Sequence, residues 1–144
     1  MAMALAQAEA AAVAGEVPVG AVLVDPASGR VLARERNRTE ALSDPTAHAE
    51  VLAIRAACAG AGSPRLPGID LYVTLEPCPL CAAAISFARL RRVYFGAYDP
   101  KGGGVDHGPR LFEQASCQHR PEVYGGLQES RAAALLRAFF QARR

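Results

Sequence analysis

Tryptophan is absent from this sequence of 144 residues, and aromatic residues make up only 6% of it. A hydrophobic core must therefore be built mainly from aliphatic side chains. Charged residues are also scarce, at 21% against 51% apolar residues. This balance excludes a disordered chain, because disordered chains are poor in apolar residues and strongly charged. A chain of this length usually forms one domain, so we expect a single domain over residues 1–144.

Long hydrophobic runs are missing as well. No stretch of about 18 apolar residues runs without glycine, proline or a charge, which excludes a transmembrane helix. The N-terminus has no basic residue ahead of its apolar run, unlike a secretory signal. The four cysteines, Cys58, Cys78, Cys81 and Cys117, are therefore expected to be thiols or metal ligands rather than disulfides. We expect a cytoplasmic protein that does not bind a membrane.

Neither sign of charge dominates, since 16 basic and 14 acidic residues leave a net charge of +2. This near balance argues against a protein that only coats nucleic acid, because such domains are far more basic. Lys101 is the only lysine, so the basic residues are otherwise arginines. Several of them lie in Arg131–Arg144, which contains no acidic residue. Such a cluster suits phosphate, which guanidinium binds through two parallel hydrogen bonds, although a solvated helix face is the plainer explanation.

Local patterns predict alternating helices and strands. Helices are expected at Ala2–Ala14, Ala47–Cys58, Cys78–Arg89 and Gln128–Arg143. Strands are expected at Val17–Val24, Val31–Arg36, Leu71–Leu75, Arg92–Phe95 and Glu122–Tyr124, with a turn at Asp25–Gly29. This order predicts an α/β layer fold with a mixed sheet.

Two short motifs carry the reactive side chains, and each lies at a predicted helix start. They are His48-Ala49-Glu50 and the segment Pro77–Cys81. Cysteines at positions i and i+3 project from one face of a helix, so Cys78 and Cys81 can bind one ion. A helix N-terminus also stabilises thiolates. Together with the His48 imidazole they supply three ligands of a tetrahedral zinc site, and an open fourth position is typical of catalytic zinc.

Glu50 indicates which reaction this site performs. Zinc lowers the pKa of a bound water to about 7. A neighbouring carboxylate can move the proton of that water to a substrate nitrogen and then to the leaving group. The predicted reaction is hydrolytic displacement of an amino group from a heteroaromatic ring, with release of ammonia. A thioredoxin-like redox centre at Cys78 and Cys81 is an alternative, but it leaves His48 and Glu50 without a role.

The combination of His48-Ala49-Glu50 with Pro77-Cys78-x-x-Cys81 resembles the zinc-dependent nucleoside and nucleobase deaminases. Among these it is most similar to the bacterial tRNA adenosine deaminases, which form inosine at the anticodon wobble position. The resemblance covers nearly the whole chain, through Glu16–Val24, Asn37-Arg38, Asp44–Glu50, Leu71–Cys78, Phe95–Ala97, Asp99, His119-Arg120 and Leu135–Arg144. It implies a cytidine deaminase-like three-layer α/β/α sandwich around a five-stranded mixed sheet, a homodimer, and a tRNA anticodon stem-loop as partner.

The resemblance also implies a role for each matching residue. His48, Cys78 and Cys81 would bind one zinc ion per chain, and Glu50 would transfer protons. The other matches would bind substrate: Asn37 and the Ala49 backbone at the base, Val17 and Pro18 as a pocket wall, Asp99 and Lys101 at neighbouring nucleotides, Phe140 near a flanking base, and Arg143 and Arg144 at phosphates.

Three features depart from the tRNA enzymes: Pro79-Leu80 between the cysteines, the run Gly103–Gly108, and Tyr98. Pro79 leans towards the bacterial guanine deaminases, which carry Cys-Pro-Met-Cys. Deamination of a free base or nucleoside such as guanine is therefore a second alternative. The tail Phe139–Arg144 instead resembles the tRNA enzymes. Because the departures lie near the expected substrate entrance, they bear on the choice of substrate rather than on the chemistry.

Overall fold

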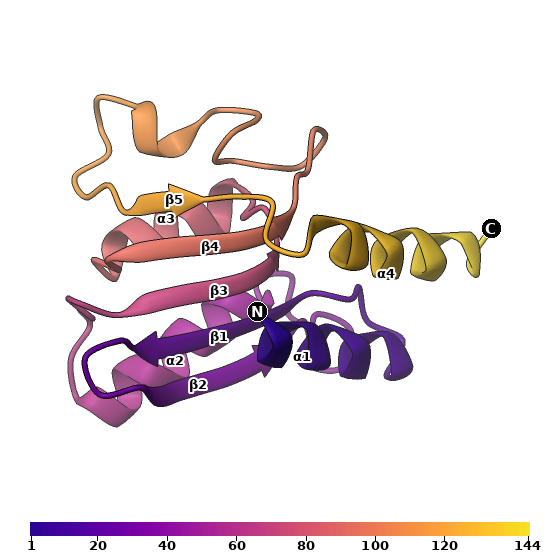
Figure 1. Ribbon diagram of the computed structural model, residues 1–144, viewed down its shortest axis with the longest axis horizontal. Helices are drawn as coiled ribbons and strands as arrows, with labels where there is room; N and C mark the ends of the chain where they lie inside the picture. Colours follow the sequence, from indigo (N-terminus) through magenta and orange to yellow (C-terminus); the bar gives the residue numbers. More distant parts are fainter.

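The computed structural model describes residues 1–144, which form one five-stranded sheet between two pairs of helices (Figure 1). The helices are α1 (Ala2–Val13), α2 (Ala49–Ala61), α3 (Pro79–Phe87) and α4 (Glu129–Gln141), with a short 3-10 helix, η1, at Leu111–Glu113. The strands are β1 (Gly20–Asp25), β2 (Arg30–Arg36), β3 (Asp70–Leu75), β4 (Arg92–Ala97) and β5 (Glu122–Tyr124). None of these helices has the length and apolar character needed to cross a membrane.

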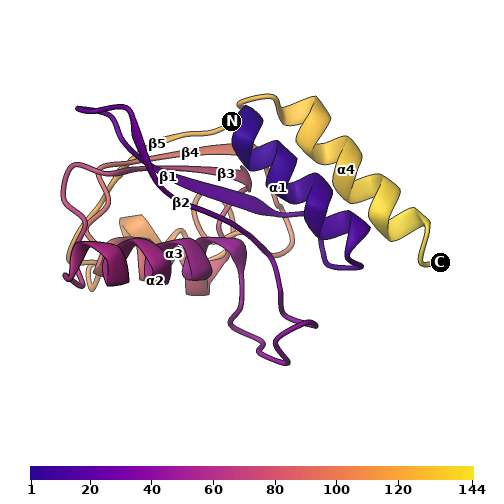
Figure 2. The same cartoon turned by 90° about the horizontal axis from the view of Figure 1, so that it is seen from below.

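The strands lie in the order β2-β1-β3-β4-β5. Strand β1 pairs antiparallel with β2 and β3, whereas β3 pairs parallel with β4, and β4 with β5. Figure 2 shows α2 and α3 on one face of the sheet, and α1 and α4 side by side on the other. The expected three-layer α/β/α sandwich with a mixed five-stranded sheet is confirmed. Because β3 and β4 are parallel, their carboxyl ends meet at one edge of the sheet, next to the start of α3.

The core is aliphatic, as the composition predicts. Its main cluster contains 17 buried residues, of which only Phe95 and Phe112 are aromatic. A smaller cluster of Leu5, Ala97 and Ala132 joins α1, β4 and α4 on the opposite face of the sheet. Both helical layers are thereby anchored to the sheet by side chains buried out of water.

Helix α1 lies unusually close to the sheet. A Cβ atom at Gly20, the first residue of β1, would be 2.0 Å from the carbonyl oxygen of Ala4 and 2.7 Å from the nitrogen of Ala8. The buried residues of α1 are Ala4, Leu5, Ala8 and Ala11. The small alanine side chains and the missing side chain at Gly20 together permit this close approach.

Several element boundaries differ from the predicted ones. Strand β1 begins at Gly20 rather than Val17, because the Val19 nitrogen donates to the Val17 carbonyl oxygen at 2.8 Å in a tight turn. Pro18 in this turn has no N–H to donate to a neighbouring strand. Helix α2 begins at Ala49 because His48 is its N-cap, and it continues to Ala61, where Gly62 ends it at a φ of 62°.

Helix α3 ends at Phe87 rather than Arg89, which adopts a positive φ of 60°. The short helix η1 was not predicted. The remaining elements occur where they were predicted, within about two residues at each end.

Candidate active site

The starts of α2 and α3 converge beyond the carboxyl ends of β3 and β4. His48 is the N-cap of α2 and Cys78 the N-cap of α3, each with an extended backbone. Ahead of α2, an Asp44 carboxylate oxygen accepts hydrogen bonds from the Thr46 nitrogen at 2.8 Å and the Thr46 hydroxyl at 2.7 Å. Pro79 occupies the first turn of α3, where its missing N–H has no helical partner to lose.

The three predicted ligands have the spacing of a zinc site. The His48 Nδ1 atom lies 3.5 Å from Cys78 Sγ and 3.4 Å from Cys81 Sγ. With Zn–N near 2.0–2.1 Å and Zn–S near 2.3 Å, a tetrahedral ion separates nitrogen from sulfur by about 3.5 Å. These are the only three histidine, cysteine or acidic residues in the chain grouped closely enough to hold an ion. The donor set therefore fits zinc, with a fourth position left for a small ligand.

The protonation of the two thiols differs. A hydrogen bond from Cys81, helped by one from His48, lowers the pKa of Cys78 to about 4 in spite of its burial. The same hydrogen bond, together with burial, raises the pKa of Cys81 far above its usual range. The hydrogen bond to Cys78 also raises the pKa of His48. Because cysteine binds a metal as the thiolate, binding of an ion at both sulfurs must release the proton of Cys81.

Glu50 lies in the first turn of α2 and is only 4% exposed. Burial raises its pKa to about 7, and the neighbouring Cys78 charge contributes in the same direction. A carboxyl group with such a pKa can both accept and release a proton near neutral pH, as a general acid and base must.

His48, Glu50 and Cys78 face a pocket of about 290 Å³. Its lining residues are Val17, Val19, Asn37, Thr39, His48, Glu50, Leu75, Glu76, Cys78, Asp99 and Gly102. This volume is just below the range of about 300–1,000 Å³ for ligand pockets, so the pocket suits a single small ring system. A larger cavity of about 360 Å³, beside α3 and η1, contains none of the three possible metal ligands.

Six of the predicted site residues line this pocket: Val17, Asn37, His48, Glu50, Cys78 and Asp99. Asn37 is only 6% exposed and lines the pocket, so its side chain is placed to contact a ligand there.

The other predicted residues, including the metal-site residue Cys81, do not line the pocket. Ala49, Cys81 and Pro18 are fully buried, and Pro18 does not line the pocket. Lys101 is exposed on the loop that follows Asp99.

The predicted residues at the end of the chain lie outside the pocket too. Phe140 is 48% exposed near the end of α4, whereas its neighbour Phe139 is 8% exposed. The Arg143 guanidinium lies over the Phe139 ring, 3.4 Å from its centroid, and Arg144 is exposed.

Five pocket residues were not predicted: Val19, Thr39, Leu75, Glu76 and Gly102. Glu76 is the only acidic residue among them. It follows a buried strand and directly precedes Pro77-Cys78, a position that could have marked it. Burial alone would raise its pKa, but hydrogen bonds from the backbone of Asp99 and from His107 outweigh this effect and lower the pKa. Glu76 is therefore a buried carboxylate.

The geometry agrees with comparisons to known proteins. Residues 1–97 match the family described as the cytidine and deoxycytidylate deaminase zinc-binding region. The chain is 59% identical over 144 residues to the tRNA-specific adenosine deaminase of Agrobacterium fabrum (strain C58), covering 100% of this chain and 93% of that protein.

Solved structures point the same way. One from a study of A-to-I editing by tRNA:A34 deaminases at the wobble position of transfer RNA has a TM-score of 0.92 and 60% identity, covering 94% of this chain and 97% of that one. The guanine deaminase from Bacillus subtilis has a TM-score of 0.65 and 31% identity, covering 98% of this chain and 88% of that one. The chain therefore belongs to the cytidine and deoxycytidylate deaminase family, and it is a zinc-dependent hydrolytic deaminase.

Proposed function

We propose that this protein deaminates adenosine to inosine at the wobble position of a tRNA anticodon. The observation that carries the proposal is that the similarity to the tRNA-specific Agrobacterium relative spans the whole chain, including α4. Phe140 is exposed near the end of α4, and Arg143 and Arg144 follow the helix; they supply the aromatic and cationic groups that an RNA loop requires. A free base such as guanine offers no phosphate to these groups.

In the proposed reaction His48, Cys78 and Cys81 bind one zinc ion, whose charge the two thiolates balance. When bound, zinc makes a hydroxide nucleophile available at neutral pH. Glu50 takes one proton of the attacking water and passes it to N1 of the adenine ring; it then takes the second proton, from the oxygen bonded to C6, and passes it to the departing amino group. The oxygen of water becomes bonded to C6, the bond from C6 to the amino nitrogen breaks, and ammonia leaves.

The pocket is proposed to receive one unstacked base. An anticodon loop offers unpaired bases that can turn outward at small cost. The side-chain amide of Asn37 would form hydrogen bonds with the purine ring, beside the Ala49 backbone, while Val17 and the buried Pro18 behind it form an apolar wall. Asp99 and Lys101, at the pocket rim, would contact the neighbouring nucleotides.

The end of α4 is proposed to extend this surface for RNA. Phe140 exposes about half of its side chain (48%), enough to stack against a flanking base. Arg143 and Arg144 lie immediately beyond it and would contact phosphates. Arg131, at the other end of α4, is already paired with Glu9 at 2.8 Å, so it contributes less free positive charge.

We further propose a single-domain, cytoplasmic homodimer. All four cysteines are free thiols, as zinc binding in a reducing compartment requires. On α3, Leu80 is 43% and Phe87 77% exposed, and residues seven apart lie on one helix face. Such an exposed apolar face suits a contact with a second copy of the chain. Sedimentation of Phe87→Glu as a monomer, beside a dimeric wild type, would support this contact; unchanged sedimentation would exclude Phe87 from it.

Incubation of the zinc-loaded protein with an anticodon stem-loop tests the substrate. A stem-loop with adenosine at the wobble position should yield inosine, whereas one with guanosine there should not react. Free guanine and free adenosine are offered in parallel. Formation of xanthine from guanine, without inosine from the stem-loop, would replace the tRNA proposal with the free-base alternative.

A further inference from the structure

The buried Glu76 carboxylate accepts five hydrogen bonds from the loop of residues 99–107. Glu76 itself lies more than 20 residues earlier in the chain, between β3 and α3. Its Oε1 atom accepts from the backbone nitrogen of Asp99 at 3.0 Å and faces Nδ1 of His107 at 2.8 Å. Its Oε2 atom accepts from the backbone nitrogens of Val105, Asp106 and His107 at 3.3, 3.0 and 3.1 Å. The Glu76 side chain is 0% exposed, so water does not compete for these bonds.

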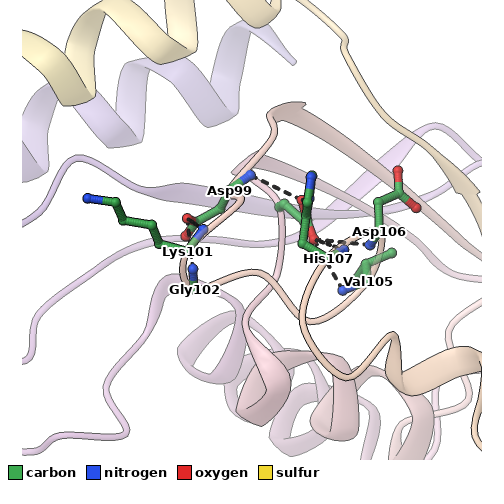
Figure 3. A network of polar contacts seen from close by, with 7 residues as sticks. Asp99, Lys101, Gly102, Val105, Asp106 and His107 are labelled. Atoms are coloured by element: carbon green, nitrogen blue, oxygen red, sulfur yellow. Dashed lines mark hydrogen bonds and ion pairs between the residues drawn. The ribbon is translucent and has the colours of Figure 1, made fainter.

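Both ends of the loop are held by this single side chain. In Figure 3, Asp99 lies on one side of the network and Val105, Asp106 and His107 lie on the other, with the dashed lines converging between them. Between these ends, an Asp99 carboxylate oxygen accepts from the nitrogens of Lys101 and Gly102 at 3.2 and 2.9 Å. The turn Asp99–Gly102, which forms the rim of the pocket, is thus held by its own hydrogen bonds and anchored to Glu76.

Glycines bring the loop into direct contact with the candidate metal site. A Cβ atom at Gly103 would lie 2.2 Å from Glu76 Oε2, and one at Gly104 would lie 2.6 Å from the Pro79 nitrogen. The Gly104 nitrogen also donates to the Pro77 carbonyl oxygen at 2.8 Å. The Gly103–Gly108 run therefore lets the loop pack against both Glu76 and the backbone that carries Cys78.

We propose that Glu76, with His107 as its partner, is a positioning residue that fixes the Asp99–Gly102 wall of the pocket for the nucleotides beside the target base. This inference rests on the proposed tRNA function. Glu76 itself does not touch the reacting atoms: it acts through the loop, on the fit of the substrate. Its removal should therefore raise KM for the stem-loop more than it lowers kcat.

The chemistry of the network requires a carboxylate. All five groups that face Glu76 are nitrogens, and four of them are backbone N–H donors. A glutamine of the same shape would place its NH2 group against donors at one of the two oxygen positions. Either the contacts at Asp99 or those at Val105–His107 would then be lost, since a donor cannot accept. The variant Glu76→Gln consequently releases one end of the loop while keeping the volume of the side chain.

Asp70→Asn provides a matched control. Asp70 is also a buried carboxylate of β3, paired with Arg91 through two hydrogen bonds of 2.8 and 2.7 Å. It begins the strand that Glu76 follows, about 20 Å away at roughly 3.3 Å per residue. Asp106→Ala serves as a second control, because only the backbone of Asp106 contacts Glu76.

The experiment compares these variants of the zinc-loaded protein with the wild type. For Glu76→Gln we expect one zinc per chain, a rise in KM of about tenfold with kcat changed less than about threefold, and faster amide exchange at Asp99 or at Val105–His107. His107→Ala should raise KM in the same direction. Asp70→Asn should lower the melting temperature without changing KM, and Asp106→Ala should behave as wild type.

Two results would overturn the proposal: wild-type KM with undisturbed amide exchange in Glu76→Gln, or loss of zinc from that variant, which would give Glu76 a part in the metal site instead. The amide-exchange measurement needs no substrate. If the wild type forms no inosine, the tRNA proposal fails while the effect of Glu76 on the loop is still measured.

Discussion

Phe139 and Phe140 are adjacent in α4, but replacing each with alanine should impair a different property: the stability of the fold for Phe139 and the binding of RNA for Phe140. Phe139 is 8% exposed, and the Arg143 guanidinium covers its ring, 3.4 Å from the centroid. Phe140 is 48% exposed, and the face that it presents to solvent has no such cover. Phe139→Ala should therefore damage the fold, whereas Phe140→Ala should damage RNA binding alone.

The size of each effect follows from these environments. Replacing a buried phenylalanine with alanine lowers the free energy of unfolding by about 3–5 kcal/mol. Because Phe139 lies near the end of a helix, we expect the lower value, about 3 kcal/mol. Lost contact with the Arg143 cation contributes about 0.5–1 kcal/mol of this. At roughly 2–4 °C per kcal/mol, the melting temperature of Phe139→Ala should fall by about 6–12 °C.

Stacking of one base on an aromatic ring is worth about 1–3 kcal/mol. Because about half of the Phe140 side chain already contacts the protein, the lower part of that range applies. A loss of about 1.4 kcal/mol corresponds to a tenfold weaker Kd for the stem-loop. Fluorescence anisotropy with labelled stem-loop and thermal unfolding, run on both variants, measure the two effects separately. Unchanged RNA affinity of Phe140→Ala, or a large fall in its melting temperature, would refute this assignment.

Three further outcomes are expected. Glu50→Gln should retain one zinc per chain by metal analysis but lose about 10²–10⁴ in kcat, and residual activity near wild type would contradict its role in proton transfer. Cys81→Ala should lose zinc and activity together, because two protein ligands hold the ion far less tightly than three; a full metal content would remove Cys81 from the ligand set. Arg144→Ala should weaken the salt dependence of stem-loop binding, measured in a titration with KCl. The slope of log K against log salt concentration should become shallower by about 0.7–1, whereas an unchanged slope would place Arg144 away from phosphate.

The sequence allowed the candidate metal ligands to be predicted because their chemistry depends on local signals. His48 and Cys78 cap helices whose starts are marked by Asp44-Pro45-Thr46 and by Pro79. Cys81 follows Cys78 by one helical turn, so the two sulfurs must lie on one side of α3. What these local signals could not predict is that the starts of α2 and α3 lie next to each other, because this depends on the tertiary fold. The parallel pairing of β3 and β4 contributes to that arrangement.

Residues whose roles depend on distant contacts were not predicted. Glu76 directly precedes Pro77-Cys78, but the groups that hold its carboxylate come from residues 99–107, more than 20 positions further along the chain. Val19 lines the pocket because the chain turns at Val17–Val19 before β1, although the apolar run there indicated a continuous strand. Such positions depend on backbone hydrogen bonds that no residue pattern encodes.

The cluster of Leu5, Ala97 and Ala132 also constrains how the chain folds during synthesis. Its three members come from the first helix, the fourth strand and the last helix. Leu5 is therefore made early but cannot be buried fully until Ala132 has left the ribosome. Strands β1–β4 and the α2–α3 layer, which lie within residues 20–97, can assemble before that. Even when α1 has packed on β1, the side of Leu5 that α4 covers thus stays exposed until α4 emerges, the stage at which a chaperone would protect it best.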